Sequence, residues 1–243
     1  MNHAPTAMAK SKMPSEILSI GGRNCRLYAP SAAQPRALLL QPLGEHEQPT
    51  LEREVAQLAE HAPMPFALAT FDIADWNREL LPWQVPAIVK NAAVTGHETL
   101  HFLRNALLPE MLRRLGDVPL VLGGYSLAGL FALWAARECD AFAGVAAASP
   151  SVWIDGWEEY AASHPLLARQ AYLSLGEREE RARNQAIARV GERLRHEHAR
   201  LQEQLGDANC VLEWNPGGHF SDCEKRLARA FRWNLERLTE TTA

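Results

Sequence analysis

The sequence has no excess of positive charge and no dense set of cysteines. Its 243 residues carry 25 Lys and Arg against 29 Asp and Glu, a net charge of −4. This balance excludes the general basic surface that attracts nucleic acid or an anionic membrane. The four cysteines form no CxxC pair and lie far apart, at Cys25, Cys139, Cys210 and Cys223. Neither a zinc cage nor a disulfide framework is indicated, and we expect reduced thiols in a cytoplasmic protein.

Long hydrophobic runs are missing as well. No apolar stretch approaches the roughly 18 to 20 residues needed to cross a bilayer, so we expect no membrane-spanning segment. Residues 1–14 lack the apolar core of a secretory signal, and we expect them to form a flexible N-terminal tail. No repeat, low-complexity tract or Pro/Gly/Ser-rich linker divides the rest. We therefore expect residues 15–243 to form one domain.

Short apolar segments alternate with segments of helical period. ILSI and NCRLYAP flank Gly21 and Gly22, which predicts an antiparallel hairpin. Buried strands are expected at 37–41, 66–71, 119–125, 144–149, 171–175 and 210–214. Helices are expected at 51–61, 97–115, 127–139, 184–205 and 222–238. This order predicts an α/β fold: a doubly wound, mostly parallel sheet with helices on both faces.

The most informative segment is PLVLGGYSLAGLFALWAA, residues 119–136, in which an apolar helix begins directly after a buried strand. A serine at such a sharp turn needs small residues two positions away on each side, and Gly124 and Ala128 meet this need. The hydroxyl of Ser126 would project above the carboxyl edge of the sheet, where ligands bind. We predict Ser126 as a nucleophile and the Leu127 amide as an oxyanion donor. The simpler alternative is that Ser126 only caps the helix.

A serine nucleophile in this kind of fold needs an acid and a base, in the chain order Ser, acid, His. His219 lies in the glycine-rich segment NPGGHF after the last expected strand, and we predict it as the base. Three carboxylates follow the strand expected at 171–175. Glu179 is our first choice for the acid, and Glu177 and Glu180 are the alternatives.

Two further features of this edge are expected. The loop after the strand at 37–41 should supply the second oxyanion donor, and we expect Leu43 because Pro42 has no N–H. Aromatic side chains above the same edge would line an apolar substrate pocket, and the candidates are Tyr125, Trp153 and Trp76.

These motifs resemble a branch of the α/β-hydrolases that includes esterase D and the enterochelin esterases. The similarity extends in order over most of the chain beyond residue 35 and rests on GGYSLAGLFALW at 123–134, ASPSVW at 148–153, YLSLGEREE at 172–180 and NPGGHF at 215–220. The resemblance implies the α/β-hydrolase fold and hydrolysis of small-molecule carboxylic esters through an acyl-enzyme, without a metal or organic cofactor. Two departures are Ala128 in place of the second glycine of GxSxG and a Glu where Asp is commoner as the acid. The second leaves open a site that works as a Ser–His dyad.

Other functions remain possible. The same site could act on a siderophore-type lactone or on a thioester. The segment His97 to His101 matches HExxH, so a zinc metallopeptidase with His97 and His101 as ligands and Glu98 as base is an alternative. No HxxGxxH continuation follows this segment. A third alternative is a binding protein that uses a hydrolase fold without catalysis.

Overall fold

The computed structural model describes residues 13–240. Residues 1–12, which make up most of the expected tail, and residues 241–243 lie outside the described part of the chain. Pro14 is joined to the body of the protein, because its carbonyl accepts a hydrogen bond from the Ala29 amide at 3.2 Å.

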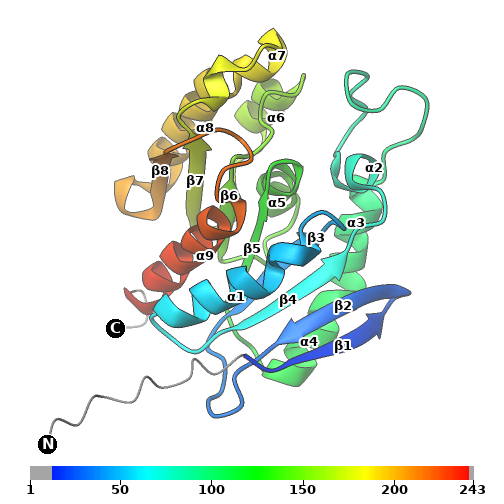
Figure 1. The fold of residues 1–243 in the computed structure, drawn as a ribbon, viewed down its shortest axis with the longest axis vertical. Helices are drawn as coiled ribbons and strands as arrows, with labels where there is room; N and C mark the ends of the chain where they lie inside the picture. The colour runs from blue at the N-terminus through cyan, green and yellow to red at the C-terminus, as the bar shows by residue number, and fades with distance from the viewer. Residues whose placement is uncertain (1–12, 241–243) are drawn as a thin grey trace, which may run out of the picture.

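In the described part of the chain, eight strands form one sheet in the order β1-β2-β4-β3-β5-β6-β7-β8 (Figure 1). The predicted hairpin is confirmed: Gly21 and Gly22, with φ of 54° and 80°, join β1 and β2. β1 and β2 pair antiparallel, as do β2 and β4, and the remaining five pairs are parallel, which confirms the predicted, mostly parallel sheet. The strands are β1 (Ser15–Ile20), β2 (Arg23–Tyr28), β3 (Leu38–Leu43), β4 (Ala67–Asp72), β5 (Leu120–Tyr125), β6 (Gly144–Ala148), β7 (Gln170–Gly176) and β8 (Cys210–Asn215).

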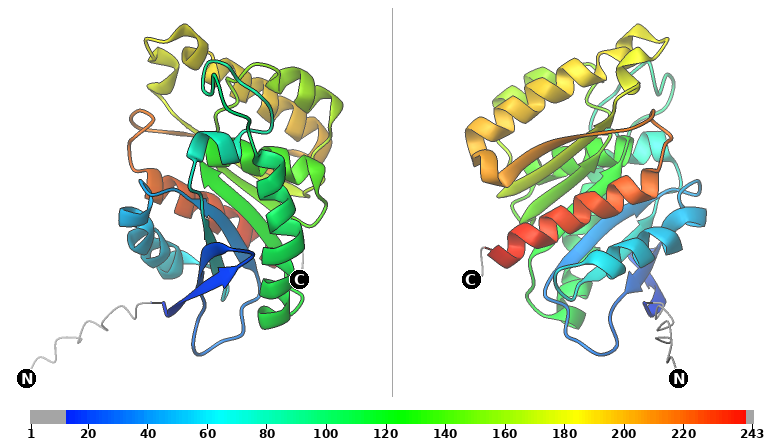
Figure 2. Two further views of the ribbon diagram at one scale, coloured as in Figure 1. Left: turned by 90° about the vertical axis from the view of Figure 1, so that its right-hand side faces the viewer. Right: turned by 60° about the vertical axis from the view of Figure 1, so that its left-hand side comes forward.

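Helices cover both faces of the sheet. α1 (Gln48–His61) and α9 (Cys223–Glu240) lie side by side on one face (Figure 2) and enclose one core cluster with it. The other face is covered by α3 (Gly96–Phe102), α4 (Leu108–Leu115), α5 (Leu127–Glu138) and α8 (Val190–Leu205). In β3, Leu38 and Leu40 belong to one cluster and Leu39 to the other. Alternate side chains thus enter two cores, which explains why the strands are apolar throughout.

Two expected helices are interrupted. The helix expected at 97–115 contains a π-helical turn, η1 (Leu103–Leu107), which ends two residues before Pro109 of α4. Proline has no N–H to bond to the preceding turn, which accounts for the widening at this point. The helix expected at 184–205 is split into α7 (Gln185–Ala188) and α8. Short helical segments that the sequence pattern did not predict are α2 (Trp76–Leu80), α6 (Trp157–Ser163), η2 (Glu179–Arg181) and η3 (Asp207–Asn209).

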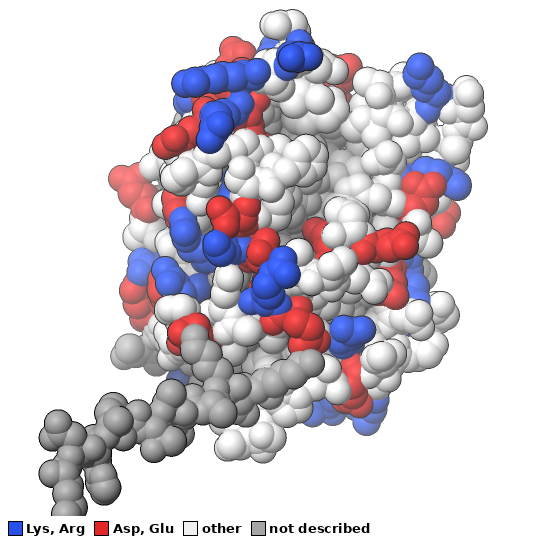
Figure 3. Space-filling view, in the orientation of Figure 1, with Lys and Arg blue, Asp and Glu red and all other residues white. Residues whose placement is uncertain are grey.

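Charges are mixed on the surface. In Figure 3, blue and red side chains are interleaved over the described part of the face shown. This pattern agrees with a net charge of only −4. Within residues 13–240, no helix combines the length and the apolar character needed to cross a membrane.

Candidate active site

Ser126 stands at a sharp turn between β5 and α5. Its φ of 57° and ψ of −117° are strained for a residue with a side chain. The turn is held by its main chain: the Ser126 amide donates to the Ala148 carbonyl at 2.9 Å, and its own carbonyl accepts from the Ser151 amide at 3.1 Å. The Ser126 hydroxyl makes no capping bond to the helix. It is therefore available for other partners, which disfavours a role as a simple helix cap.

The small residues on either side of the serine are required by close packing. A Cβ atom at Gly124 would lie 2.5 Å from the Cβ of Ala128, closer than real side chains approach. Gly124 and Ala128 occupy the two positions at which the sequence pattern predicted small residues. The end of β5 and the start of α5 can pack this closely around Ser126 only because these two side chains are so small.

His219 and Ser126 are brought together from distant parts of the chain. The Nε2 atom of His219 lies 3.0 Å from the Oγ atom of Ser126, and its Nδ1 atom lies 2.7 Å from Oε2 of Glu179. When Nδ1 carries the proton and donates to Glu179, Nε2 is free to accept the hydroxyl proton of Ser126. The three side chains thus form a continuous Ser–His–Glu chain of hydrogen bonds at the carboxyl edge of the sheet.

Glu179 is buried and held by several donors. Its Oε1 atom accepts hydrogen bonds from the Gly176 amide and the Ser149 hydroxyl, both at 2.7 Å. Burial alone would raise the pKa of Glu179, but the hydrogen bond and charge of His219, followed by the bonds from Ser149 and Gly176, hold this pKa below its usual value. A Cβ atom at Gly176 would lie 2.9 Å from Oε1. Glycine at this position therefore leaves room for the carboxylate.

The two alternative carboxylates lie elsewhere. Glu177 is exposed. Glu180 makes two hydrogen bonds of 2.8 Å to Arg195. Of the three acids considered from the sequence, the structure brings Glu179 against the imidazole of His219.

Solved structures share this arrangement of strands and helices. A siderophore hydrolase, EstA from Aspergillus nidulans, is 18% identical, with 98% of this chain and 99% of that chain covered and a TM-score of 0.67. EstB from the same organism is 15% identical over 93% and 96% of the two chains, with a TM-score of 0.70. An enterochelin esterase from Shigella flexneri is 19% identical over 97% of this chain and 61% of that chain, with a TM-score of 0.68. The chain has the α/β-hydrolase fold. Neither a family model nor a curated protein matches the sequence.

In this α/β-hydrolase fold, a cavity of about 440 Å³ opens beside Ser126 and His219. Apolar side chains make up much of its wall, namely Trp153, Ala182, Ile187, Val190 and Phe220. Phe220 is 91% exposed, so it stands at the rim rather than in the floor. The cavity therefore offers a mainly apolar surface next to the candidate nucleophile.

The three aromatic residues expected in the pocket are found in different places. Trp153 lines the cavity. Tyr125 and Trp76 are not among the residues that line this cavity. Tyr125 is buried under His219, and its hydroxyl donates to the His219 carbonyl at 2.6 Å. Trp76 packs edge-on against His46, with 4.7 Å between ring centroids.

The two expected oxyanion donors also differ in placement. Leu127 is the first residue of α5, where main-chain amides have no partner within the helix. Leu43 lies at the end of β3 rather than in the following loop, and its carbonyl accepts from the Ile73 amide at 2.9 Å. Leu43 is paired in parallel register with Asp72 of β4. In such a ladder the amide and carbonyl of one residue face the same strand, so the Leu43 amide is directed toward β4.

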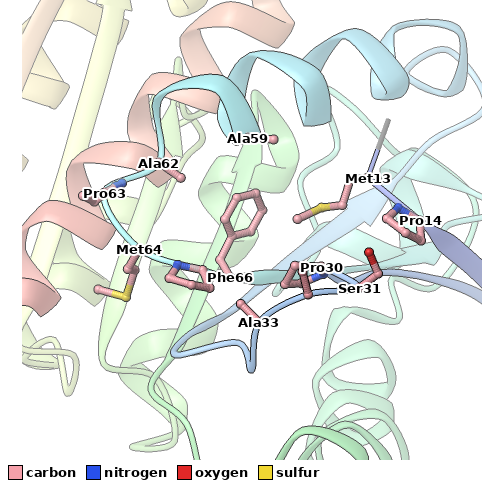
Figure 4. Close-up of a pocket in the computed structure, with 12 residues that line it drawn as sticks. Met13, Pro14, Pro30, Ser31, Ala33, Ala59, Ala62, Pro63, Met64 and Phe66 are labelled. Atoms are coloured by element: carbon pink, nitrogen blue, oxygen red, sulfur yellow. The ribbon is translucent and has the colours of Figure 1, made fainter. Parts of the chain in front are cut away.

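A second hollow of similar volume lies at the opposite edge of the sheet (Figure 4). Its lining includes Pro14, directly before β1, Pro30, shortly after β2, and Phe66, directly before β4. These positions are at the amino ends of the parallel strands, whereas Ser126 follows a carboxyl end. The hollow in Figure 4 is therefore remote from the Ser–His–Glu chain.

The HExxH segment shows no developed metal centre. His97, Glu98 and His101 are exposed on α3, and the His97 ring contacts Trp134 edge-on at 4.7 Å between centroids. Within residues 13–240, no group of three or more His, Cys, Asp or Glu side chains is arranged to hold a metal ion. A catalytic zinc site needs three protein ligands, and HExxH supplies two.

Two residues of the site were missed by sequence reasoning. Ser149, directly after β6, has a φ of 45° and donates its hydroxyl to Glu179. It lies in the ASPSVW segment, but no feature of that segment identified its role. Arg226, on α9, contacts Glu179 and Ser149. One arginine on an amphipathic helix carries no sequence signal of such a position.

Proposed function

We propose that this protein is a serine hydrolase that cleaves carboxylic esters through an acyl-enzyme intermediate. The observation that carries the proposal is the hydrogen-bonded chain from Ser126 Oγ through both ring nitrogens of His219 to Glu179 Oε2, with links of 3.0 and 2.7 Å. Structural neighbours described as siderophore hydrolases and an enterochelin esterase support the same class of reaction. Because a fold alone does not determine a function, the proposal rests mainly on the contacts of Ser126, His219 and Glu179.

The proposed reaction follows from these contacts. His219 accepts the hydroxyl proton as Ser126 Oγ attacks the ester carbonyl, and Glu179 stabilises the imidazolium that forms. The Leu127 amide, at the positive end of α5, would donate to the tetrahedral oxyanion. His219 then protonates the leaving alkoxide. Water, activated by the same histidine, attacks the acyl-enzyme and releases the acid and free Ser126.

The size and the lining of the cavity favour a restricted range of acyl groups. Its volume of about 440 Å³ is close to three times the roughly 150 Å³ of a cavity that holds benzene. Its largely apolar wall favours an aliphatic chain or an aromatic ring over a charged acyl group. We therefore propose esters with a moderate apolar acyl group as substrates.

A siderophore-type lactone is a second candidate substrate. The specific observation in its favour is that two of the structural neighbours are siderophore hydrolases. A lactone would be opened by the same steps, with the leaving alkoxide remaining part of the acyl chain. A thioester would also react by these steps.

Hydrolysis of 4-nitrophenyl esters of increasing acyl length tests the proposal. We expect Ser126→Ala to lower kcat by at least about 10³-fold, because the nucleophile is lost. The matched control is Ser163→Ala, since Ser163 is an exposed serine on α6 that should leave kcat unchanged. Retention of wild-type turnover by Ser126→Ala would refute the proposal. Loss of turnover on treatment with EDTA, with no effect of a serine-directed phosphonate, would favour the metallopeptidase instead.

A further inference from the structure

Arg226 lies beneath the candidate site, where its positive charge is almost completely removed from water. It extends from α9, and only 2% of its surface is exposed. A buried guanidinium needs partners for its N–H groups, because an unpaired charge in the interior is costly. Its partners show what the side chain holds in place.

One edge of the guanidinium faces the acid of the Ser–His–Glu chain. The Nη2 atom of Arg226 lies 3.2 Å from Oε1 of Glu179 and also donates to the Ser149 hydroxyl. Ser149 itself donates to the same Oε1 atom at 2.7 Å. Oε1 therefore faces Arg226, Ser149 and the Gly176 amide, while Oε2 faces His219.

The other amine of Arg226 faces the loop that carries His219. Nη1 donates to the Tyr125 hydroxyl at 2.6 Å and contacts the Gly218 carbonyl at 3.4 Å. Tyr125 links Arg226 to His219, because its hydroxyl donates to the His219 carbonyl at 2.6 Å. The guanidinium also lies over the Tyr125 ring, 5.2 Å from its centroid. A single side chain thus reaches both the acid and the backbone of the candidate base.

The two oxygens of the Glu179 carboxylate thus have different hydrogen-bond partners. Rotation of the Glu179 carboxylate away from His219 would also break the charge-assisted hydrogen bond that Oε1 accepts from Arg226. The planar guanidinium donates in fixed directions, which a lysine ammonium does not. Stability alone is a weak reason for such a pair, since replacing a buried ion pair by apolar residues is often neutral.

We propose that Arg226 is a positioning residue for ester hydrolysis. It fixes the Glu179 carboxylate with Oε2 toward Nδ1 of His219 and, through Tyr125, holds the backbone of His219. It contacts neither the nucleophile nor the cavity that would hold the acyl group. This inference rests on the proposed function, and it adds the device that keeps the acid and base aligned.

A double-mutant cycle with Glu179 tests the inference. If Arg226 acts through the Glu179 carboxylate, its replacement should have little effect on kcat once that carboxylate is removed. The variants are Arg226→Met, Glu179→Gln and the double substitution, assayed with one 4-nitrophenyl ester. We expect Arg226→Met to lower kcat by about 10- to 100-fold and to change KM less than about 2-fold. In the Glu179→Gln background, the same substitution should lower kcat by less than about 3-fold.

Two variants separate positioning from folding. Arg137→Met is the matched control, because Arg137 is a buried arginine paired with buried Glu197 on α8 and has no contact with the Ser–His–Glu chain. It should lower stability while kcat of the folded protein stays at the wild-type value. Arg226→Lys keeps the charge but not the fork of donors, and its kcat should lie between those of wild type and Arg226→Met.

A readout that does not depend on turnover is the low-field proton resonance of the His219 Nδ1–H bond to Glu179. We expect it in the wild type and in Arg137→Met, and we expect it to shift or broaden in Arg226→Met. Equal losses of kcat from Arg226→Met in the wild-type and Glu179→Gln backgrounds, with an unchanged resonance, would overturn the positioning role. Ser126→Ala belongs in the same assay: if it is inactive, such a result rejects only the role of Arg226, and if it is active, the proposed function fails as well.

Discussion

The hydroxyl of Tyr125 donates a 2.6 Å hydrogen bond to the main-chain carbonyl of His219. The residue directly before the candidate nucleophile therefore holds the backbone of the candidate base. Burial raises the pKa of Tyr125, so its hydroxyl keeps its proton and remains a donor throughout the neutral range. The end of β5 and the loop after β8 are thereby joined at the point where catalysis would take place.

Tyr125→Phe removes this hydroxyl and leaves the ring in place. We expect kcat for ester hydrolysis to fall about 3- to 10-fold with little change in KM, and stability to fall by about 1 kcal/mol. Tyr172→Phe is the matched control, since Tyr172 is buried and its hydroxyl donates to Glu213 at 2.6 Å. It should show the stability loss alone. If the two variants behave alike in both kcat and urea unfolding, Tyr125 has only a structural role.

The acid can be identified by comparing three amide substitutions. Glu179→Gln should lower kcat by roughly 10²- to 10⁴-fold, because the amide cannot stabilise the imidazolium and favours the wrong tautomer. Glu177→Gln and Glu180→Gln should remain within about 2-fold of wild type, since neither carboxylate bonds to His219 in the structure. Wild-type kcat in Glu179→Gln would instead indicate a Ser–His dyad. The measurement is kcat for one 4-nitrophenyl ester under identical conditions.

Much of this site could be predicted because its signals are local. The strand, the turn and the helix around Ser126 follow each other without a gap, and small residues at 124 and 128 mark the turn. His219 follows the last strand in a glycine-rich loop, and parallel strands bring all such loops to one edge. Local patterns of this kind also predicted the hairpin and the order of strands and helices.

Other contacts depend on side-chain directions that a sequence pattern does not contain. Tyr125 was expected in the substrate pocket, but its side chain is buried under His219. Leu43 was expected in a loop, but β3 continues through it and pairs it with β4. The role of Arg226 depends on the packing of α9 against three strands, β5, β6 and β7, distant from it in the sequence. Only tertiary structure determines such positions.

The side chains that line the cavity should determine which acyl chain lengths are preferred. Trp153→Ala should enlarge the cavity and shift the optimum of kcat/KM toward longer acyl chains in a 4-nitrophenyl ester series. We expect a change of roughly 10-fold in the ratio between the longest and the shortest ester. Trp76→Ala is the control, because Trp76 packs against His46 outside the cavity. An equal shift in both variants would show that Trp153 does not define the acyl pocket.

A buried carboxyl group away from the candidate site should make the stability of the protein depend on pH. Glu54, on α1, is 3% exposed, and its Oε1 atom has no hydrogen-bond partner among residues 13–240. Burial, and then the negative charge of Glu47, raise the pKa of Glu54 well above its usual value. The folded state therefore holds this proton to a higher pH than the unfolded state, in which the pKa is about 4.3. Stability conferred by the protonated form is lost as the pH rises through the folded-state pKa.

Glu54→Gln should remove this dependence, because the amide is neutral at every pH and can donate to the unpaired Oε1 of Gln41. We expect its stability relative to wild type to improve as the pH rises from 5 to 8, by about 1 to 3 kcal/mol at the upper end. Urea unfolding at the two pH values measures the change. Glu203→Gln, at an exposed position on α8, serves as the control. A difference from wild type that is the same at both pH values would contradict the prediction.

An activated hydroxyl at Ser126 should react covalently with a serine-directed reagent. Folded protein is incubated with a fluorophosphonate, and the modified peptide is identified by mass spectrometry. We expect one adduct, on Ser126, which forms at the same rate as ester hydrolysis is lost and which is absent in Ser126→Ala. An adduct on another residue, or full ester hydrolysis in protein that the reagent does not modify, would contradict it.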